Sequence, residues 1–398
     1  MPFLSDSSKN IPSSPIRKLV PFSDAAKSKG IKVYHLNIGQ PDIKTPKQVI
    51  DRIKNLEREI IEYSPSRGMT SYRKGLVHYY KQFQIRLKEE EIMVTTGCSE
   101  AIPFAIQSCF NPGDELIIPE PFYANYNCFS SASGVRIVPL TSKIEDGFAL
   151  PAISEIEKKI TDKTKGIFIC NPNNPTGYVY SKSELEQLGE IVLKHDLFLL
   201  ADEVYKEFNY SSTPFYSILN LKGLEQHVVV IDSISKRYSM CGARVGSLVT
   251  RNKEVMDAVF KYADARLCPP TLGQIAAEAA LDTPASYFEN VLAEYVKRRD
   301  IVVDRINEID GAYCTSPQGA FYVIARLPID DSDKFCRWLL EEFEQDKETL
   351  MLAPATGFYA SPDLGKDEVR IAYVLNRVDL EKAMNCLKIA LEIYESKN

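Results

Sequence analysis

The sequence predicts an α/β fold: a mainly parallel β-sheet with helices on both faces, and a smaller α+β domain beside it. Three observations support this fold class. From residue 92 onward, short apolar stretches alternate with longer helical stretches, which is typical of repeated strand and helix units. The stretch 227–231 is apolar and mostly β-branched, as in strands buried on both faces. Polar residues follow directly where the apolar stretches end.

The length and composition of the chain allow two domains. With 398 residues, 44% of them hydrophobic, the chain can bury a large core. We predict a large domain over residues 46–286 and a small domain that combines residues 1–45 with residues 287–398. A helix over residues 287–307, which contain few helix breakers, is expected to connect the two domains.

Charge, apolar run length and cysteine pattern exclude several classes of protein. The net charge is −6 and basic residues are interspersed with acidic ones, so no nucleic-acid-binding surface is expected. No apolar run has the length of a membrane span, and the N-terminal residues lack the pattern of a secretory signal. Nine cysteines without a C-x-x-C pair favour a reducing, cytoplasmic location. The four histidines show no metal-ligand spacing, so no metal site is predicted.

The N-terminal part of the chain predicts helices separated by polar loops. One short helix is expected over residues 15–29 and another over residues 46–59. The loop 37–42 between them contains Gly39, which allows a ligand to approach the backbone closely. A second loop with turn-forming residues follows at 63–68.

The first strand of the predicted sheet, 92–96, runs into residues 97–99, Gly-Cys-Ser, which begin a helix that extends to about residue 110. A glycine and small residues at a helix N-terminus form an anion site, because free N–H groups and the helix dipole point at one spot. The sequence therefore predicts a phosphate or carboxylate site here.

Three further strands end in polar or turn-forming sequence. They are predicted at 115–118 before 119–123, at 166–170 before 171–177, and at 197–201 before 202–205. The asparagines and prolines of 171–177 cannot continue a sheet, so this segment is expected to be a rigid polar loop. A capping box at 181–184 predicts the start of the next helix.

The strand 227–231 is followed by the most distinctive residues of the chain. Lys236 lies near the hydroxyls of Ser233 and Ser235, and Arg244 follows eight residues later. This setting suits a lysine that forms a Schiff base, because its compact amine would stand beside groups that can hold a phosphate. The spacing Ser233-x-x-Lys236 also occurs in serine acyl-enzymes, but no K-T-G or S-D-N partner motif is present.

These reactive residues are expected to converge, because ligands of open α/β sheets collect at the carboxyl ends of the strands. No G-x-G-x-x-G follows a strand and no phosphate-binding P-loop motif occurs, so a dinucleotide or nucleoside triphosphate is not favoured. A lysine, one carboxylate, a phenol, an amide and several phosphate donors are the groups that pyridoxal 5'-phosphate requires. We therefore predict this cofactor.

Four motifs in this order resemble those of the class I and II aminotransferases of pyridoxal phosphate fold type I, most closely the bacterial aspartate aminotransferase-like enzymes. The motifs are N-N-P-T-G at 173–177, A-D-E-V-Y at 201–205, S-I-S-K with G-A-R-V-G at 233–246, and P-Q-G-A-F-Y at 317–322. The resemblance extends over essentially the whole chain. It implies a homodimer and an aminotransferase that takes the amino group of an L-amino acid, preferably aspartate, to a 2-oxo acid such as 2-oxoglutarate by a ping-pong mechanism.

The resemblance also assigns roles to individual residues. Lys236 is expected to bind the cofactor covalently and to move the α-proton, and Asp202 to pair with the ring nitrogen. Cofactor contacts are further expected from Asn174 and Tyr205 at the phenolic oxygen, Tyr123 on the ring face, and Cys98, Ser99, Ser233, Ser235 and Arg244 at the phosphate. Arg370 is expected to bind the substrate α-carboxylate with Gly39 and Asn174, and Tyr63 to reach the phosphate in the neighbouring subunit.

The substrate side chain is the open point of this assignment. Some aspartate-specific relatives carry a lysine where this chain has Ser99, so another cation would have to bind a distal carboxylate. Arg266 is the first candidate and Arg17 the second. Alanine and aromatic aminotransferases share the same motifs, and carbon–sulfur β-lyases share the same scaffold. A non-catalytic binding protein is disfavoured, because every matched cofactor position holds a chemically competent residue.

Overall fold

The computed structural model describes residues 2–5, 8–9, 11 and 14–395. Its main feature is a mixed seven-stranded sheet with the order β2-β8-β7-β6-β5-β3-β4, in which β8 runs antiparallel to both of its neighbours. The strands are β2 (Ile92–Thr95), β3 (Glu115–Glu120), β4 (Arg136–Thr141), β5 (Thr164–Cys170), β6 (Phe198–Asp202), β7 (Val228–Ser233) and β8 (Gly246–Val249). The predicted α/β fold with a mainly parallel sheet is confirmed.

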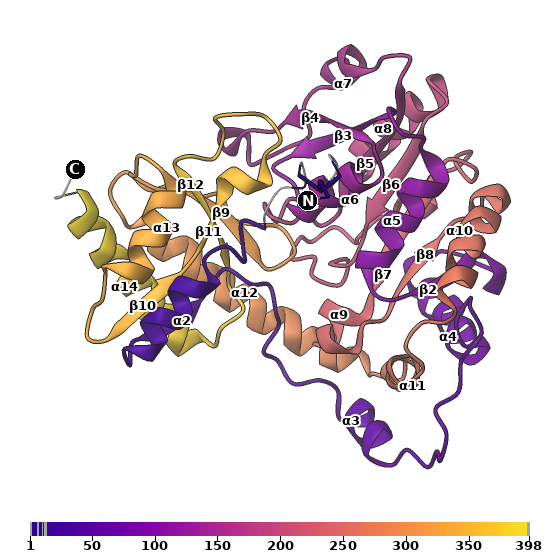
Figure 1. Ribbon diagram of the computed structural model, residues 1–398, viewed down its shortest axis with the longest axis horizontal. Coiled ribbons are helices and arrows are strands. Elements are labelled where there is room, and N and C mark those ends of the chain that lie inside the picture. The colour runs from indigo at the N-terminus through magenta and orange to yellow at the C-terminus, as the bar shows by residue number, and fades with distance from the viewer. Residues whose placement is uncertain (1, 6–7, 10, 12–13, 396–398) are drawn as a thin grey trace.

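Helices cover both faces of this sheet (Figure 1). In β7, Val229 and Ile231 pack into one hydrophobic cluster, while Val228 and Val230 pack into the other, as the two-residue period of a strand requires. The first cluster includes residues of α5 (Cys98–Cys109), α6 (Asn125–Ala132) and α10 (Lys253–Arg266). The second includes residues of α4 (Thr70–Tyr80), α7 (Ile153–Lys159), α8 (Lys182–Lys194) and α11 (Thr271–Ala280).

Two smaller sheets lie on the left of the molecule in Figure 1, beside the part that holds the seven-stranded sheet. One pairs β1 (Lys32–His35) with β10 (Glu348–Met351), and the other has the order β11-β12-β9. The remaining strands are β9 (Tyr322–Arg326), β11 (Ala353–Pro354) and β12 (Glu368–Ala372), and the helices near them are α2 (Val20–Ser28), α13 (Ser332–Glu341) and α14 (Arg377–Glu395). Segments from both ends of the chain thus meet here, although the division at residues 46 and 286 stays a prediction.

The long helix α12 (Ala285–Asn307) crosses between the two parts of the molecule in Figure 1, where a helix over 287–307 is predicted. The capping box is also present, because Ser181 Oγ accepts from the Glu184 amide and Glu184 Oε2 accepts from the Ser181 amide. The helix α3 (Lys47–Lys54) is shorter than the predicted 46–59. Beyond it, residues 57–63 are exposed.

Candidate active site

A cavity of about 780 Å³ lies where β5, β6 and β7 end. Asp202 pairs with Cys170 of the neighbouring strand and Ser233 pairs with Gly246, so the strand register brings these ends together. The strand β12 of a second sheet adds Arg370 to the lining of the cavity. Most of the predicted site residues line the cavity: Gly39, Cys98, Ser99, Tyr123, Asn174, Asp202, Tyr205, Ser233, Ser235, Lys236, Arg244 and Arg370.

Lys236 projects into the cavity from α9 (Ile234–Arg237), a single helical turn that directly follows β7. Its Nζ donates a hydrogen bond to the Gly39 carbonyl at 2.7 Å and lies 3.9 Å from Cys241 Sγ. Within the described residues, no carboxylate forms an ion pair with this amine. An amine that is held by a carbonyl rather than by an acid is available for bonding to an aldehyde.

One end of the cavity has the composition of an anion site. Gly97, with φ of 71°, begins α5, and a Cβ at this position would lie 2.5 Å from Arg244 Nη2. Only glycine therefore allows the guanidinium to lie against the start of the helix. The Oγ atoms of Ser233 and Ser235 are 2.8 Å apart, and Ser233 Oγ also donates to the Val245 carbonyl at 2.8 Å. Helix N–H groups, hydroxyls and a guanidinium together suit a phosphate monoester.

The floor of the cavity holds one buried acid. Asp202 Oδ2 accepts a hydrogen bond from Tyr126 Oη at 3.0 Å, and Oδ1 accepts from the Val204 amide at 3.2 Å. Burial raises the pKa of Asp202 to about 6, although these hydrogen bonds oppose the shift. A cationic ring nitrogen bound beside this carboxyl group would favour its ionised form, as the predicted pairing with the cofactor requires.

The tyrosines of the cavity form a hydrogen-bonded wall. Tyr205 Oη and Tyr322 Oη lie 2.9 Å apart, and both rings are buried. Gly39 packs against this pair so tightly that a Cβ would lie 1.6 Å from Tyr322 Oη. Tyr123 accepts a hydrogen bond from Asn125 Nδ2 at 2.8 Å, and burial raises its pKa to about 12. Burial also raises the pKa of Tyr205, so Tyr205 and Tyr123 act as neutral donors or packing surfaces at neutral pH.

Arg370 is a buried cation to which the described part of the chain offers no acidic partner. Its Nη1 donates to Asn174 Oδ1 at 3.0 Å and its Nη2 to the Asn37 carbonyl at 2.5 Å, while its Nε is buried without a partner. Its guanidinium lies 4.5 Å from the ring centre of Tyr322 and 4.7 Å from that of Phe358. No carboxylate among the described residues neutralises it, and burial lowers its pKa. This arrangement is a receptor for a carboxylate from outside the chain.

Two predicted residues lie outside the cavity. Arg266 donates to the Ser66 and Val94 carbonyls at 3.2 and 3.3 Å, and its Nε faces Glu100 at 3.6 Å. Arg266 does not line the cavity of its own subunit, and its Nη1 is buried without a hydrogen-bond partner among the described residues. Its role as the reader of the substrate side chain therefore stays a prediction. Tyr63 is 77% exposed, so its contact with a neighbouring subunit stays a prediction.

The second candidate reader, Arg17, does line the cavity and is exposed at its rim beside Ile16 and Ile38. Sequence reasoning missed the roles of Tyr322 and Tyr126 in the cavity wall. Tyr322 ends the motif at 317–322 and could have been found there, whereas Tyr126 gives no signal other than its position shortly after Tyr123.

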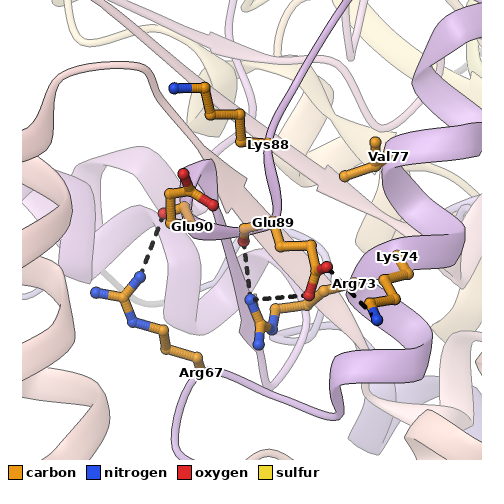
Figure 2. Close-up of a pocket in the computed structure, with 7 residues that line it drawn as sticks. All are labelled: Arg67, Arg73, Lys74, Val77, Lys88, Glu89 and Glu90. Atoms are coloured by element: carbon orange, nitrogen blue, oxygen red, sulfur yellow. Dashed lines mark hydrogen bonds and ion pairs between the residues drawn. The ribbon is translucent and has the colours of Figure 1, made fainter.

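A second hollow, of about 650 Å³, lies on the surface near α4 and has no comparable chemistry (Figure 2). Arg73 Nη1 donates to the Glu89 carbonyl at 2.9 Å and lies 3.9 Å from its carboxylate, which Lys74 also approaches to 3.9 Å. Arg67 donates to the Glu90 carbonyl at 3.3 Å. These contacts tie the start of α4 to residues 88–90, so we interpret them as structural.

Comparison with known proteins shows that the chain is similar to aminotransferases over nearly its whole length. A sequence profile of the aminotransferase class I and II family matches residues 31–387. The aspartate aminotransferase of Bacillus subtilis is 30% identical over 92% of this chain and 93% of its own length. The aromatic-amino-acid aminotransferase 2 of Thermococcus litoralis is 30% identical over 98% of each chain. The alanine aminotransferase of Pyrococcus furiosus has a similar structure, with a TM-score of 0.89, 29% identity, and coverage of 98% of this chain and 100% of its own.

Proposed function

Because this chain belongs to the class I and II aminotransferases, we propose that it transfers the amino group of an L-amino acid, preferably aspartate, to a 2-oxo acid by means of pyridoxal 5'-phosphate. One observation supports the proposal most directly. The Lys236 amine and the Arg370 guanidinium face the same cavity as buried Asp202, and neither cation has a carboxylate partner among the residues that the structure describes.

The donor set of the cavity fits this cofactor from end to end. Lys236 provides the amine to which an aldehyde can bond, and Asp202 provides the acid for a ring nitrogen. At the phenolic oxygen of the ring, the proposed donors are Tyr205 and Asn174. At the phosphate, they are the N-terminus of α5 with Cys98 and Ser99, together with Ser233, Ser235 and Arg244, and Tyr123 covers the ring face.

Bound pyridoxal phosphate supplies an electron-accepting ring that stabilises negative charge at the substrate α-carbon. The chain itself contributes orientation and proton transfer. Arg370 holds the α-carboxylate in a two-point contact, with Asn174 and Gly39 beside it. Lys236 would then take the α-proton and return it, because its amine faces the cavity that Arg370 also lines. The donor and acceptor acids use the site in turn, which gives ping-pong kinetics.

We assign recognition of a distal carboxylate to Arg17. Four cations line the cavity among the described residues, and Lys236, Arg244 and Arg370 are already assigned to the aldehyde, the phosphate and the α-carboxylate. Arg17 remains, at the open rim where a substrate side chain would extend. The apolar surfaces of Ile16 beside it favour the second candidate, an aminotransferase for alanine or aromatic amino acids.

Activity with 2-oxoglutarate and each of L-aspartate, L-alanine and L-tyrosine separates these substrates. We expect the highest kcat/KM for aspartate, with parallel lines in double-reciprocal plots. Arg17→Met should lower kcat/KM for aspartate roughly 10- to 150-fold, which corresponds to a loss of about 1.5–3 kcal/mol, and should leave kcat/KM for alanine unchanged. Lys18→Met is the matched control, because Lys18 pairs with Asp333 and does not line the cavity. Equal rates for aspartate in wild type and Arg17→Met would remove Arg17 from this role. Release of ammonia and pyruvate from a cysteine conjugate would instead indicate a β-lyase.

A homodimer completes the proposal. Exposed apolar side chains gather on α3 and the segment after it, where Ile53, Ile60 and Ile61 accompany Tyr63. We propose that a second copy covers this surface and receives Tyr63 at its phosphate site. Light scattering should give the mass of a dimer, and Tyr63→Phe should weaken binding of the cofactor. A monomer with full activity would contradict both statements.

A further inference from the structure

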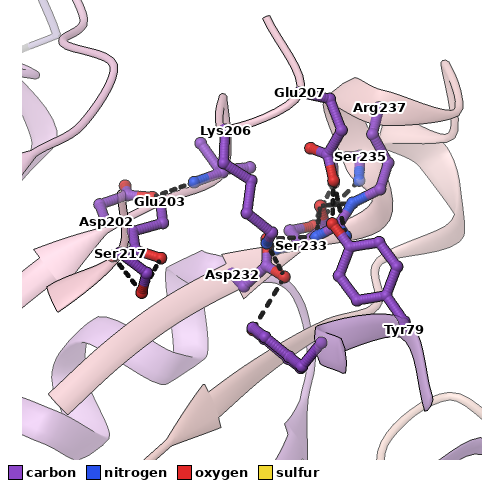
Figure 3. Close-up of polar contacts among 12 residues, drawn as sticks. Tyr79, Asp202, Glu203, Lys206, Glu207, Ser217, Asp232, Ser233, Ser235 and Arg237 are labelled. Carbon is purple, nitrogen blue, oxygen red and sulfur yellow. Dashed lines mark hydrogen bonds and ion pairs between the residues drawn. The ribbon is translucent and has the colours of Figure 1, made fainter. Parts of the chain in front are cut away.

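Beneath the turn that carries Lys236 lies a buried ionic cluster that the proposed chemistry does not use (Figure 3). Its charged members come from the segment after β6, from the end of β7 and from the end of α9. The side chains of Lys206, Asp232 and Arg237 are 0%, 1% and 2% exposed, respectively. The other acidic members are Glu203 and Glu207, and burial raises the pKa of each.

Asp232 is the centre of this cluster. Its carboxylate forms ion pairs with Lys206 and Arg237, and it also accepts hydrogen bonds from Tyr80 Oη at 3.1 Å and from the Ser233 amide at 2.8 Å. Burial alone would raise the pKa of Asp232, but the two cations lower it to about 2. The carboxylate is therefore ionised at every pH at which the enzyme is expected to work.

Arg237 connects the two ends of the catalytic turn. It directly follows Lys236, and its Nε and Nη2 each donate to the Ser233 carbonyl at 3.2 Å. The same guanidinium pairs with Asp232, and its Nη1 lies 3.1 Å from Glu207 Oε1. One side chain thus closes a loop over residues 232–237, which contains the hydroxyls and the amine that face the cavity.

Lys206 pairs with the same Asp232 carboxylate but forms no hydrogen bond with the backbone of this loop. Its Nζ lies 5.1 Å from the ring centre of Tyr80, 5.2 Å from that of Tyr79 and 5.7 Å from that of Phe83. Burial and the charge of Arg237 lower the pKa of Lys206 to about 8, although Asp232 opposes the shift. The two cations are therefore alike in burial and in their partner, but only Arg237 reaches the backbone of the catalytic turn.

Clusters of this kind are costly, because apolar side chains of similar volume often stabilise a fold better than buried ion pairs. Their advantage is that ion pairs and hydrogen bonds fix the orientation of the groups they join. A guanidinium that is fixed by two carboxylates and a carbonyl allows the loop only one arrangement. That arrangement holds Ser233 Oγ and Ser235 Oγ within 2.8 Å of each other and presents Lys236 to the cavity.

We propose that Arg237 and Asp232 are positioning residues for the cofactor, which clamp the 232–237 loop so that its hydroxyls receive the phosphate and its lysine meets the aldehyde. The clamp joins the two ends of the loop, and neither of its residues lines the cavity, so it touches neither substrate nor cofactor. The proposal rests on the function proposed above for Lys236, Ser233 and Ser235.

The test compares Arg237→Gln with Lys206→Met, each of which removes one buried cation from Asp232. Dissociation constants are measured for pyridoxal phosphate and for pyridoxamine phosphate, which lacks the aldehyde and so reports on the non-covalent contacts, the phosphate site among them, without the bond to Lys236. We expect Arg237→Gln to weaken binding of both ligands at least tenfold and to shift the absorption band of bound pyridoxal phosphate. Lys206→Met should change binding less than threefold, whatever its effect on the melting temperature.

Arg237→Lys guards against a variant that does not fold. It retains the charge but cannot reach Asp232, Glu207 and the Ser233 carbonyl together, so its binding should be intermediate. Equal weakening by Lys206→Met and Arg237→Gln would overturn the clamp in favour of a general effect of charge, and so would wild-type affinity in Arg237→Gln. If the wild-type protein itself binds neither ligand, it is the proposed function that fails.

Discussion

Replacing Arg370 by methionine should abolish most activity without the usual cost of removing a buried charged group. The guanidinium has no acidic partner among the described residues, so the substrate carboxylate is expected to be its only anion. Two charge-assisted hydrogen bonds of about 1.5–3 kcal/mol each amount to roughly 3–5 kcal/mol after partial compensation by water. This corresponds to a fall in kcat/KM by about two to four powers of ten.

The stability of Arg370→Met should change little, because two effects oppose each other. Removing an uncompensated buried charge is favourable, while the Asn174 and Asn37 oxygens lose a donor. Arg298 is the matched control. It is also buried, but it pairs with Asp42 at 2.6 Å and with Glu294 at 3.0 Å.

Arg298→Met should therefore destabilise the protein more than Arg370→Met and reduce kcat/KM less. Thermal melts and steady-state kinetics with the same amino acid provide both comparisons. If Arg370→Met keeps kcat/KM within threefold of wild type, or melts well below Arg298→Met, the site does not bind a carboxylate as described.

Two further predictions concern the cavity wall. Burial raises the pKa of Asp202 to about 6, so the folded, cofactor-free protein holds the proton of this carboxyl group more tightly than the unfolded chain does. The free energy of unfolding is therefore highest below about pH 4 and falls by about 3 kcal/mol as the pH rises through 6. Urea unfolding of Asp202→Asn should lack this part of the pH dependence, and an unchanged profile would show that another group is responsible. Gly39→Ala should lower the free energy of unfolding by about 1–3 kcal/mol and also lower kcat, because a Cβ would lie 1.6 Å from Tyr322 Oη. Gly242→Ala is the control and should change neither quantity, because the added Cβ would meet no atom within 4 Å. Melting temperatures and steady-state kinetics of the two variants test this prediction, and equal values for both variants would contradict it.

The sheet and the strand-end residues could be predicted because their signals are local. Apolar stretches of strand length are followed by turn-forming or reactive residues, and parallel connectivity then brings Asp202, Asn174 and Lys236 to one edge. The far wall of the cavity depends on packing between distant segments. Nothing in the local sequence indicates that Tyr322 meets Tyr205, 117 residues away.

The surroundings of two other cations could not be predicted for the same reason. The sequence around Arg266 cannot reveal that its guanidinium is engaged by Glu100 and by two carbonyls from another part of the chain. Lys206 is likewise indistinguishable from an exposed lysine, because its burial depends on Asp232 from the next strand. Charged side chains are placed by partners that the fold supplies, and spacing along the chain does not identify those partners.

The most direct test of the central claim is to locate the cofactor on the chain. The purified protein is incubated with pyridoxal phosphate, reduced with borohydride and digested, and the modified peptide is identified by mass spectrometry, with Lys236→Ala as the control. We predict that the phosphopyridoxyl group is found on Lys236 and is absent from the variant. Stoichiometric modification of another lysine, or none in a protein that still transfers amino groups, would contradict the mechanism built on Lys236.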